Sequence, residues 1–328
     1  MSEQGGARGG SPEPIPVSSA AMSSAPPRIR RSCLAVPGSS EKMLAKARAL
    51  RADEVFLDLE DAVTPEHKSD ATRERVVAAL REPDWKATTR AVRVNGVGTP
   101  WCLDDLLLVV AGAGDRLHSV IVPKVESPAE IHFVAQLLAQ LELKHGLEQP
   151  IGIEVQIESP RGLVAVEQIA TASPRVETLI FGPGDYAASA GMPQLSVGEV
   201  ADSYPGDVWH YVLARIVTAA HASGLQAIDG PYAAIRDVDG FRRSATRSRL
   251  LGYDGKWSLH PDQIEICNDV YRPTQAEYDR AERILAAYAS ASNGAVVFER
   301  EMIDEASRKM AVSVVERGRA AGMTRSER

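Results

Sequence analysis

The chain has few cysteines and no long apolar run. Its 328 residues contain three cysteines, Cys33, Cys102 and Cys267. Because they are odd in number and widely spaced, they indicate neither a disulfide framework nor a zinc site, and they fit a reducing cytosol. No apolar stretch approaches the roughly 20 residues that a membrane-spanning helix needs. We therefore expect a cytoplasmic protein with no membrane partner.

Basic runs and nucleotide-binding glycine patterns are also missing. The formal net charge is -7, with 37 Lys and Arg against 44 Asp and Glu, so nucleic acid is not an expected partner. No G-x-G-x-x-G follows an expected strand, so the usual dinucleotide-binding signature is absent. The chain is 44% hydrophobic and 25% charged. At this length, that composition suits one large α/β domain of barrel size or two smaller ones.

The N-terminal segment, residues 1–27, is rich in Gly, Ser, Pro and Ala. It has no apolar segment of the kind that secretory signals contain. Glu3 and Glu13, together with the lack of an amphipathic period, leave little support for a transit peptide. We expect this segment to be a disordered tail.

From residue 31 onward, short apolar runs alternate with helical stretches. We expect eight strands, at 32–36, 55–59, 91–94, 120–122, 151–157, 178–181, 227–228 and 256–259. Each is followed by a helix, which is typical of parallel strands with right-handed crossovers. Eight such units close into a (β/α)₈ TIM barrel, here over residues 28–272, and a doubly wound open sheet is the alternative.

The last stretch, residues 273–328, exceeds what a barrel needs. Its pattern predicts helices at 276–291 and 302–316, with a turn at 292–294 and an extended run at 296–298 between them. We expect a C-terminal helical extension. It would act either as a lid over its own barrel mouth or as an arm over a neighbouring subunit.

One stretch, residues 151–185, suggests the chemistry. An apolar run ends at Glu158, a helix is expected at 163–172, and a second apolar run leads through Gly-Pro-Gly to Asp185. Neighbouring parallel strands lie about 5 Å apart, so acids at adjacent strand tips can share one hard cation. We predict that Glu158 and Asp185 hold Mg²⁺, with Mn²⁺ possible. The alternative is that both acids cap helices or lie in solvent.

Other polar side chains follow the carboxyl ends of strands. They are Asp58, Glu60, Asp61, Arg93, Lys124, Asp229 and His260. An arginine inside an apolar strand needs an anion, which could be a substrate carboxylate, a developing oxyanion, Glu60 or Asp61. Acids, a metal and an arginine suit chemistry through an enolate. Lys124 also leaves a Schiff-base aldolase open, although the paired acids would then have no purpose.

Seven short motifs occur in a fixed order. They are Arg31-Ser32 with Pro37-Gly38, LDLEDAV at 57–63, RVNG at 93–96, VPKVES at 122–127, QIESPRG at 156–162, FGPGD at 181–185 and GKWSLHP at 255–261. In this order they resemble the citrate lyase β-subunit-like family, within the wider HpcH/HpaI aldolase group. The resemblance runs from about Arg31 to Met310. It implies a (β/α)₈ barrel, Mg²⁺, acyl-CoA or acyl-carrier thioesters, and carbon–carbon cleavage by a Claisen-type route.

The resemblance also implies roles for individual residues. It places the metal on Glu158 and Asp185, and it places Arg93 on the substrate's carboxylate or thioester oxygen. The positions that it assigns to CoA or substrate contacts are Lys42, Lys46, Gly184, Leu259 and His260. The aromatic residue expected before the Pro-Gly turn is Ala35 here, so that one CoA contact is not predicted.

The C-terminal extension carries part of the same resemblance. Relatives that act on malyl-CoA-like thioesters place an aspartate of a G-x-M-I-D motif in the neighbouring subunit's site. Met302-Ile303-Asp304 matches this motif, and Arg300 replaces its glycine. Asp304 is therefore a candidate acid/base delivered in trans. Carrier-protein-bound citrate lyase β subunits are shorter here, so the extension favours a stand-alone CoA enzyme.

These implications combine into one predicted activity. The chain would be a Mg²⁺-dependent lyase that cleaves malyl-CoA or β-methylmalyl-CoA to glyoxylate and acetyl-CoA or propionyl-CoA. Arg93, Glu60, Asp61 and Asp304 would be catalytic, in a homo-oligomer that is a trimer or hexamer. The alternatives are a citramalyl-CoA lyase, a malyl-CoA thioesterase, a citrate lyase β-like citryl lyase, an aldolase acting on a free hydroxy-keto acid, and a non-enzymatic acyl-CoA-binding subunit.

Overall fold

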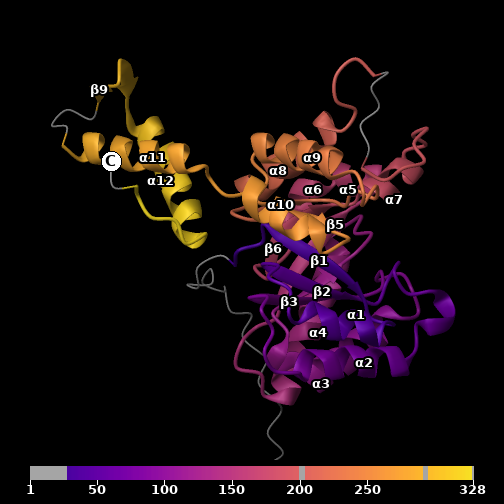
Figure 1. Cartoon of the computed structure of the whole chain (residues 1–328). Coiled ribbons are helices and arrows are strands. Elements are labelled where there is room, and N and C mark those ends of the chain that lie inside the picture. The colour runs from indigo at the N-terminus through magenta and orange to yellow at the C-terminus, as the bar shows by residue number, and fades with distance from the viewer. Residues whose placement is uncertain (1–27, 199–203, 291–294, 327–328) are drawn as a thin grey trace, which may run out of the picture.

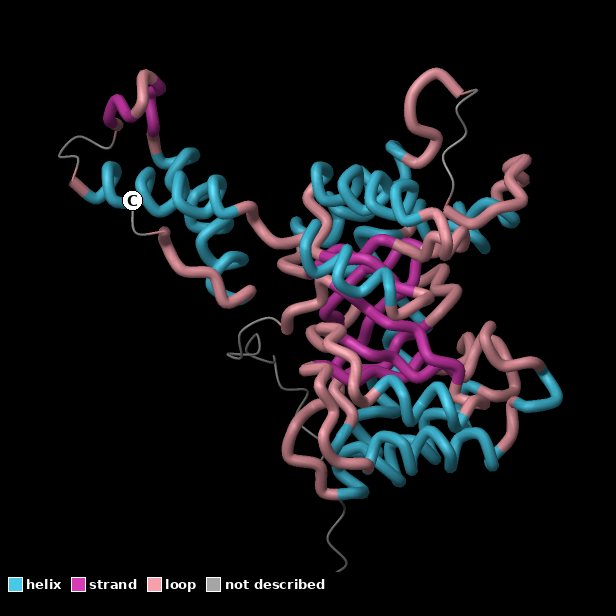
Figure 2. Tube along the Cα trace, viewed as in Figure 1, coloured by secondary structure: helices cyan, strands magenta, loops and turns pink. Residues whose placement is uncertain are grey.

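Eight parallel strands form a closed barrel (Figures 1 and 2). The computed structural model describes residues 28–198, 204–290 and 295–326, so the expected tail at 1–27 lies outside the described residues. The strands are β1 (Ser32–Pro37), β2 (Glu54–Asp58), β3 (Thr89–Arg93), β4 (Ser119–Val122), β5 (Gly152–Ile157), β6 (Val176–Phe181), β7 (Gln226–Asp229) and β8 (Gly255–Ser258). Strand β8 pairs with β1 and closes the barrel. The predicted TIM barrel is confirmed, and the open sheet is wrong.

Helices surround the barrel. They are α1 (Glu41–Ala47), α2 (Asp70–Arg81), α3 (Cys102–Ala113), α4 (Pro128–His145), α5 (Pro160–Val164), α6 (Val166–Ala170), α7 (Pro183–Ser189), α8 (His210–Ala222), α9 (Val238–Leu251) and α10 (Asp262–Val270), with 3₁₀ turns at Pro65–His67 and Gly114–Arg116. The single helix expected at 163–172 is wrong. Ala165, at φ -94° and ψ 6°, separates α5 from α6. Within the described residues, no helix has both the length and the apolarity to cross a membrane.

Two apolar layers fill the molecule, because side chains alternate between the two faces of each strand. The inward-facing residues form one cluster of Cys33, Phe56, Ala91, Ile121, Ile180, Ile228 and Trp257. The outward-facing residues pack against the helices in a second, larger cluster. The same alternation turns Asp58 and Arg93 inward, and these two residues are register partners on β2 and β3.

An ion-pair network closes the amino end of the barrel. The side chain of Arg30 is only 1% exposed, and its Nε lies 2.7 Å from Glu54. Its Nη1 donates to Gln226 at 2.8 Å, and its Nη2 contacts Glu154 at 3.2 Å and also binds Glu177. This end of the barrel is therefore filled by the chain's own side chains.

The C-terminal extension is a separate layer of α11 (Gln275–Ala289), β9 (Val296–Phe298), β10 (Glu301–Ile303) and α12 (Glu305–Ala320). The helix expected at 302–316 is wrong at its start, since Met302 lies in a β-hairpin with Val297 opposite. The turn expected at 292–294 lies outside the described residues.

This extension leaves the barrel at its amino end. Arg249 pairs with Glu277 at 2.7 Å, and Arg317 pairs with Asp254, just before β8, at 3.1 Å. In Figure 1 it extends away from the side where α7 lies. The extension is thus an arm that does not cover the mouth of its own barrel.

Candidate active site at the barrel mouth

A buried arginine at the end of β3 is held by a carboxylate of β2. Arg93 donates from Nε and Nη2 to the two oxygens of Asp58, at 2.7 and 2.6 Å, and its Nη1 lies 3.1 Å from Glu60. Burial alone would lower the pKa of Arg93, but the charges of Asp58, Glu60 and Glu158 outweigh it and raise that pKa. Arg93 is therefore a fixed cation at the floor of the mouth.

The main partner of this arginine was not predicted. The sequence suggested Glu60 or Asp61, and the structure confirms the Glu60 contact but gives the two-point contact to Asp58. Asp58 and Arg93 both point inward because each lies an even number of residues from the interior residues Phe56 and Ala91. That alternation was readable in the sequence.

The predicted acid pair also meets at the mouth. Glu158 is 2% exposed and accepts hydrogen bonds from the backbone N–H of Lys124 at 2.7 Å and from Gln156 Nε2 at 2.6 Å. Burial first, and then repulsion by Asp185, raise the pKa of Glu158 well above its ordinary value. Asp185 lies in the first turn of α7 with a half-exposed side chain. The two carboxylates are thus close enough to repel each other.

Glycine at position 182 makes room for the buried carboxylate. A Cβ there would lie 2.4 Å from Glu158 Cβ and 2.5 Å from Glu158 Oε2. No group of three or more His, Cys, Asp or Glu side chains among the described residues is arranged to hold a metal. Mg²⁺ is commonly bound by only one or two carboxylates plus water and substrate oxygens. Glu158 and Asp185 therefore fit this ion as a two-carboxylate site.

A lysine reaches across the mouth from the end of β4. Lys124 Nζ lies 2.5 Å from Glu60, 3.1 Å from Asp61 and 3.8 Å from Asp185. Burial would lower the pKa of Lys124, but the hydrogen bond and charge of Glu60, with the charges of Asp61 and Asp185, raise it. A Schiff-base lysine must lose its proton to attack a carbonyl carbon. The raised pKa therefore argues against the Schiff-base alternative.

The mouth carries more negative than positive charge. Its carboxyl groups are Asp58, Glu60, Asp61, Glu158 and Asp185, and its cations are Arg93 and Lys124. If all are ionised, five negative charges face two positive ones. Burial raises the pKa of Glu60, so protonation of Glu60 can remove part of this excess negative charge. A bound divalent cation would relieve it more completely.

One acid predicted at the strand tips faces the other way. Asp229, at the end of β7, receives a hydrogen bond of 2.7 Å from Lys256 Nζ. Both residues are buried, and the ammonium lies 5.9 Å from the ring centre of Phe241 in α9. Asp229 therefore points outward to the helix layer, because odd and even positions of a strand face opposite sides.

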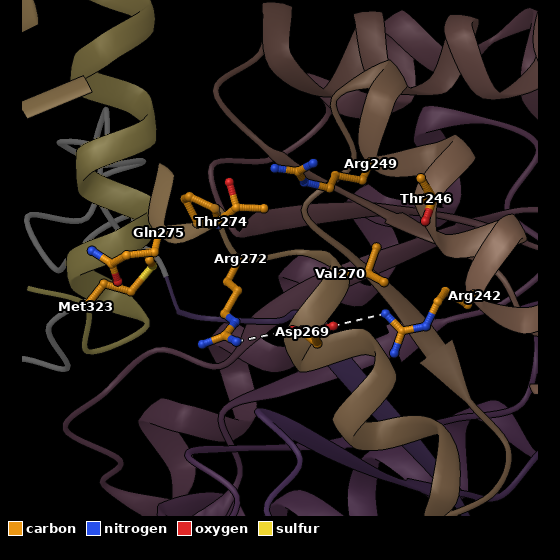
Figure 3. Close-up of a pocket in the computed structure, with 10 residues that line it drawn as sticks. Arg242, Thr246, Arg249, Asp269, Val270, Arg272, Thr274, Gln275 and Met323 are labelled. Carbon is orange, nitrogen blue, oxygen red and sulfur yellow. Dashed lines mark hydrogen bonds and ion pairs between the residues drawn. The ribbon is translucent and has the colours of Figure 1, made fainter. Parts of the chain in front are cut away.

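Two hollows of about 410 and 620 Å³ lie at the amino end of the barrel, near the root of the arm. Arg242, Asp269 and Arg272 line both, and both arginines bind Asp269 (Figure 3). Neither hollow contains a residue of the predicted site. The two hollows are therefore separate from the candidate site at the mouth.

The profile of the HpcH/HpaI aldolase/citrate lyase family matches residues 31–261. The chain belongs to this family. The family assignment identifies an oxo-acid lyase and confirms the resemblance seen in the seven motifs.

Individual relatives cover nearly the whole chain. An L-malyl-CoA/beta-methylmalyl-CoA lyase of Cereibacter sphaeroides is 37% identical over 302 residues, which are 88% of this chain and 95% of the relative. A (3S)-malyl-CoA thioesterase of the same species is 35% identical over 80% of this chain and 84% of its own length. The crystal structure of protein CitE from Mycobacterium tuberculosis with magnesium, acetoacetate and coenzyme A is 31% identical, with a TM-score of 0.71 over 89% of this chain and 98% of that one.

Several family positions lie on the rim that holds the acid pair. Lys42 and Lys46 are exposed on α1, which follows β1, and Gly184 precedes Asp185 in α7. Leu259 and His260 directly follow β8, and His260 Nδ1 lies 3.4 Å from Asp262. The barrel topology thus brings these residues to the carboxyl ends of the strands, where active sites of this fold are built.

The remaining family position lies elsewhere. Asp304 caps α12, where it accepts a hydrogen bond of 3.1 Å from the backbone N–H of Ser307. It is exposed, and it lies on the arm that extends away from the mouth of its own barrel. Within one chain, Asp304 does not join the other candidate residues.

Proposed function

We propose that this chain is a Mg²⁺-dependent carbon–carbon lyase that cleaves malyl-CoA or β-methylmalyl-CoA to glyoxylate and acetyl-CoA or propionyl-CoA. The reverse condensation would use the same groups, and Mn²⁺ is the alternative ion. The observation that carries this proposal is the Glu158–Asp185 pair beside Arg93, in a chain 37% identical to a lyase of that name over 88% of its length. Closely packed acids beside a fixed cation suit a reaction that develops an enolate.

The acid pair would bind the ion, and the arginine would act on the substrate. Glu158 and Asp185 would hold Mg²⁺, whose charge, when it is bound, polarises the 2-hydroxy acid end of the substrate. Arg93 has two of its nitrogens fixed by Asp58, so its orientation is set before substrate arrives. It would stabilise the negative thioester enolate oxygen that forms as the carbon–carbon bond breaks.

A carboxylate must take the hydroxyl proton of the substrate. Glu60 is the best placed within the chain, since it lies between Arg93 and Lys124 and burial raises its pKa. When the proton leaves, the hydroxyl oxygen forms the carbonyl of glyoxylate and the carbon–carbon bond breaks. Its electron pair forms a double bond between the α-carbon and the thioester carbon, and the thioester carbonyl oxygen takes the negative charge of the enolate. A proton returned to the enolate carbon gives acetyl-CoA or propionyl-CoA. Asp61 is the alternative base, at 3.1 Å from the same lysine.

CoA would approach from the rim. Lys42 and Lys46 are four residues apart on an exposed helix face, where both ammonium groups can meet the CoA phosphates. Gly184, Leu259 and His260 would line the acyl part. Replacing both lysines with methionine should raise the KM for a CoA thioester and leave kcat unchanged. For an aldolase that acts on a free hydroxy-keto acid, the same substitutions should leave the KM unchanged.

The arm would complete the site of a neighbouring subunit in a homo-oligomer, a trimer or hexamer. Asp304 would reach that subunit's mouth as an acid or base. The hairpin beside it exposes Val297 and Met302, opposite each other, by 73% and 77%, and these apolar side chains suit a contact between subunits. An Asp304→Ala chain mixed with an Arg93→Ala chain should recover activity. No recovery, once subunit exchange is shown, would exclude delivery in trans.

Product analysis tests the proposed reaction. The purified protein is incubated with racemic malyl-CoA and Mg²⁺, with and without EDTA. Glyoxylate and acetyl-CoA that form only with the metal support the lyase. Free malate and CoA would instead identify the thioesterase, which the 35% identical relative makes the second candidate.

If the protein is a lyase, a parallel assay must identify its preferred thioester. The candidate thioesters differ by one methyl group, which changes the binding free energy by only about 1–3 kcal/mol. Citramalyl-CoA and β-methylmalyl-CoA are therefore run beside malyl-CoA. Tight CoA binding without turnover of any thioester would indicate the accessory subunit.

A further inference from the structure

Lys124 has a backbone conformation that lysine rarely adopts. Its φ is 55°, and among the described residues the other non-glycine residues with positive φ are Asp84, Glu299 and Arg300, none of which follows a barrel strand. The left-handed region costs a non-glycine residue roughly 1 kcal/mol. Strain of this kind is retained where the surroundings enforce it, and it concentrates at functional sites.

This conformation gives Lys124 two contacts with the proposed metal site. Its backbone N–H donates to Glu158 Oε1 at 2.7 Å, while its side chain turns into the mouth and places the ammonium 3.8 Å from Asp185 Oδ1. One residue thus contacts both carboxylates of the pair. Among the described residues, Asp185 forms no ion pair except this one, and Glu158 forms none.

The ammonium is shared unequally among three carboxylates. It is 2.5 Å from Glu60 and 3.1 Å from Asp61, so it has two closer partners than Asp185. The lysine side chain is 42% exposed, which leaves it room to move. A small shift away from Asp185 would therefore keep most of its electrostatic stabilisation.

We propose that the Lys124 ammonium is a placeholder cation for the metal site. In the metal-free protein it offsets the charge of Asp185, and it withdraws onto Glu60 and Asp61 when a divalent ion binds. The physical reason is that Mg²⁺ bound to carboxylate oxygens at about 2.1 Å repels an ammonium that stays on the same carboxylate. This inference rests on the proposed metal site, and it adds that a residue of the chain competes with the ion.

Two consequences follow for binding and stability. The lysine stabilises the metal-free mouth, because it offsets part of an excess of negative charge. For the same reason it weakens the apparent affinity for Mg²⁺, because the ion must displace it. A lysine with a purely structural role would stabilise the metal-free and metal-bound proteins equally.

The test compares Lys124→Met, which keeps the length and removes the charge, with Lys124→Arg, which keeps the charge. Mg²⁺ is titrated into the metal-free protein by calorimetry, without substrate. We expect Lys124→Met to bind Mg²⁺ roughly tenfold more tightly than the wild type and Lys124→Arg to stay within about twofold. The matched control is Lys68→Met, since Lys68 binds Asn95 at 2.6 Å and forms no ion pair with a carboxylate within the described part of the chain. Its Mg²⁺ affinity should not change.

Melting temperatures supply the second readout. In EDTA, Lys124→Met should melt below the wild type, and added Mg²⁺ should raise its melting temperature by more than it raises that of the wild type. An unchanged or weaker Mg²⁺ affinity, or an equal loss of stability with and without Mg²⁺, would overturn the proposal.

Two features keep this test decisive. If Lys124→Met does not fold, Lys124→Gly removes the charge, suits the left-handed backbone and is measured in the same way. The Mg²⁺ titration contains no substrate, so it does not depend on the reaction. A chain that binds Mg²⁺ but cleaves none of malyl-CoA, β-methylmalyl-CoA and citramalyl-CoA would disprove the lyase and leave this test valid.

Discussion

Each end of the barrel buries an arginine among carboxylates. At the amino end this arginine is Arg30, and at the carboxyl end it is Arg93; their side chains are 1% and 8% exposed. The residue types are similar, yet the two clusters differ in how far their carboxylates are exposed to solvent.

The amino-end cluster is closed. Arg30 binds Glu54, Gln226 and Glu177, so each of its three nitrogens has a partner. Glu154 receives hydroxyl hydrogen bonds from Ser119 at 2.6 Å and Thr178 at 3.2 Å. Burial, followed by repulsion from Glu154, raises the pKa of Glu54 well above its ordinary value, which favours a protonated and uncharged Glu54. Glu54 Oε1 has no hydrogen-bond partner among the described residues, yet Glu54 and Arg30 are shielded from solvent.

The carboxyl-end cluster is open. The side chains of Asp61 and Asp185 are 50% and 44% exposed, and the acids outnumber the two cations. Carboxylates outnumber arginines at both ends, so access to solvent is the feature that marks the carboxyl-end cluster as the candidate binding site. Four tests with five substitutions follow, from the largest expected effect to the smallest. The first three address this difference, and the fourth concerns the arm.

The acid pair should control activity and not stability. We expect Glu158→Gln and Asp185→Asn each to lower kcat by roughly 10³-fold, because the ion loses one of its two ligands. The Glu158→Gln protein should be as stable as the wild type or more so, because the pKa of Glu158 is raised and its charged form is disfavoured. Steady-state kinetics and urea unfolding measure the two effects. Glu82→Gln, at the exposed partner of Arg48, is the matched control and should keep full activity. If Glu158→Gln unfolds, the acid pair has a structural role instead.

The amino-end arginine should control stability and not activity. Arg30→Met leaves buried carboxylates without their cation, which costs about 3–5 kcal/mol of unfolding free energy. Urea unfolding measures this loss. The kcat per folded molecule should not change, because the mouth lies at the other end of the barrel. A loss below about 1 kcal/mol would contradict the closed network.

The raised pKa of Glu54 predicts a pH dependence with a definite sign. The folded state holds the Glu54 proton to higher pH than the unfolded state, whose carboxyl titrates near 4.5. This contribution to stability is complete below that pH and is lost as pH rises toward the folded pKa. Glu54→Gln mimics the protonated acid, so it should flatten this decline and add roughly 1 kcal/mol at pH 7. Urea unfolding at several pH values measures this pH dependence. If the unfolding free energy of Glu54→Gln falls more steeply with pH than that of the wild type, the pKa of Glu54 is not raised by folding.

The smallest expected effect concerns the arm. Glu299 and Arg300 form the two-residue turn between β9 and β10 at φ 46° and 70°, which is a conformation that favours glycine at the second position. Arg300→Gly should stabilise the arm by about 0.5–1 kcal/mol, and thermal unfolding measures this. A destabilised variant would mean that Arg300 makes a contact worth more than the strain it carries.

The sequence was most informative where strand-like and helix-like segments alternate regularly. Alternating strand and helix patterns predicted all eight barrel strands, because each strand is buried on both faces and reads as a short apolar run. The acid pair was found because both acids end strands that are neighbours in the sheet, Glu158 after β5 and Asp185 after β6.

The errors arose where a one-residue difference decides direction. Asp229 was grouped with the mouth, yet it faces the helices and pairs with Lys256, because its side chain lies on the outward face of β7. Met302 was placed in a helix because three apolar residues at 296–298 gave no sign of the strand that would pair with them. The conformation of Lys124 had no sequence signal, since neither glycine nor asparagine marks its left-handed φ.

The location of the ion is the most direct test of the difference between the two ends. Crystals grown with Mn²⁺ would be measured for anomalous scattering, which locates the ion without any assumption about the reaction. We predict one peak per chain, between the carboxylates of Glu158 and Asp185, and none beside Arg30. A peak at another site, or no peak at the mouth in crystals that contain saturating Mn²⁺, would contradict the proposal that the barrel mouth is a metal-dependent active site.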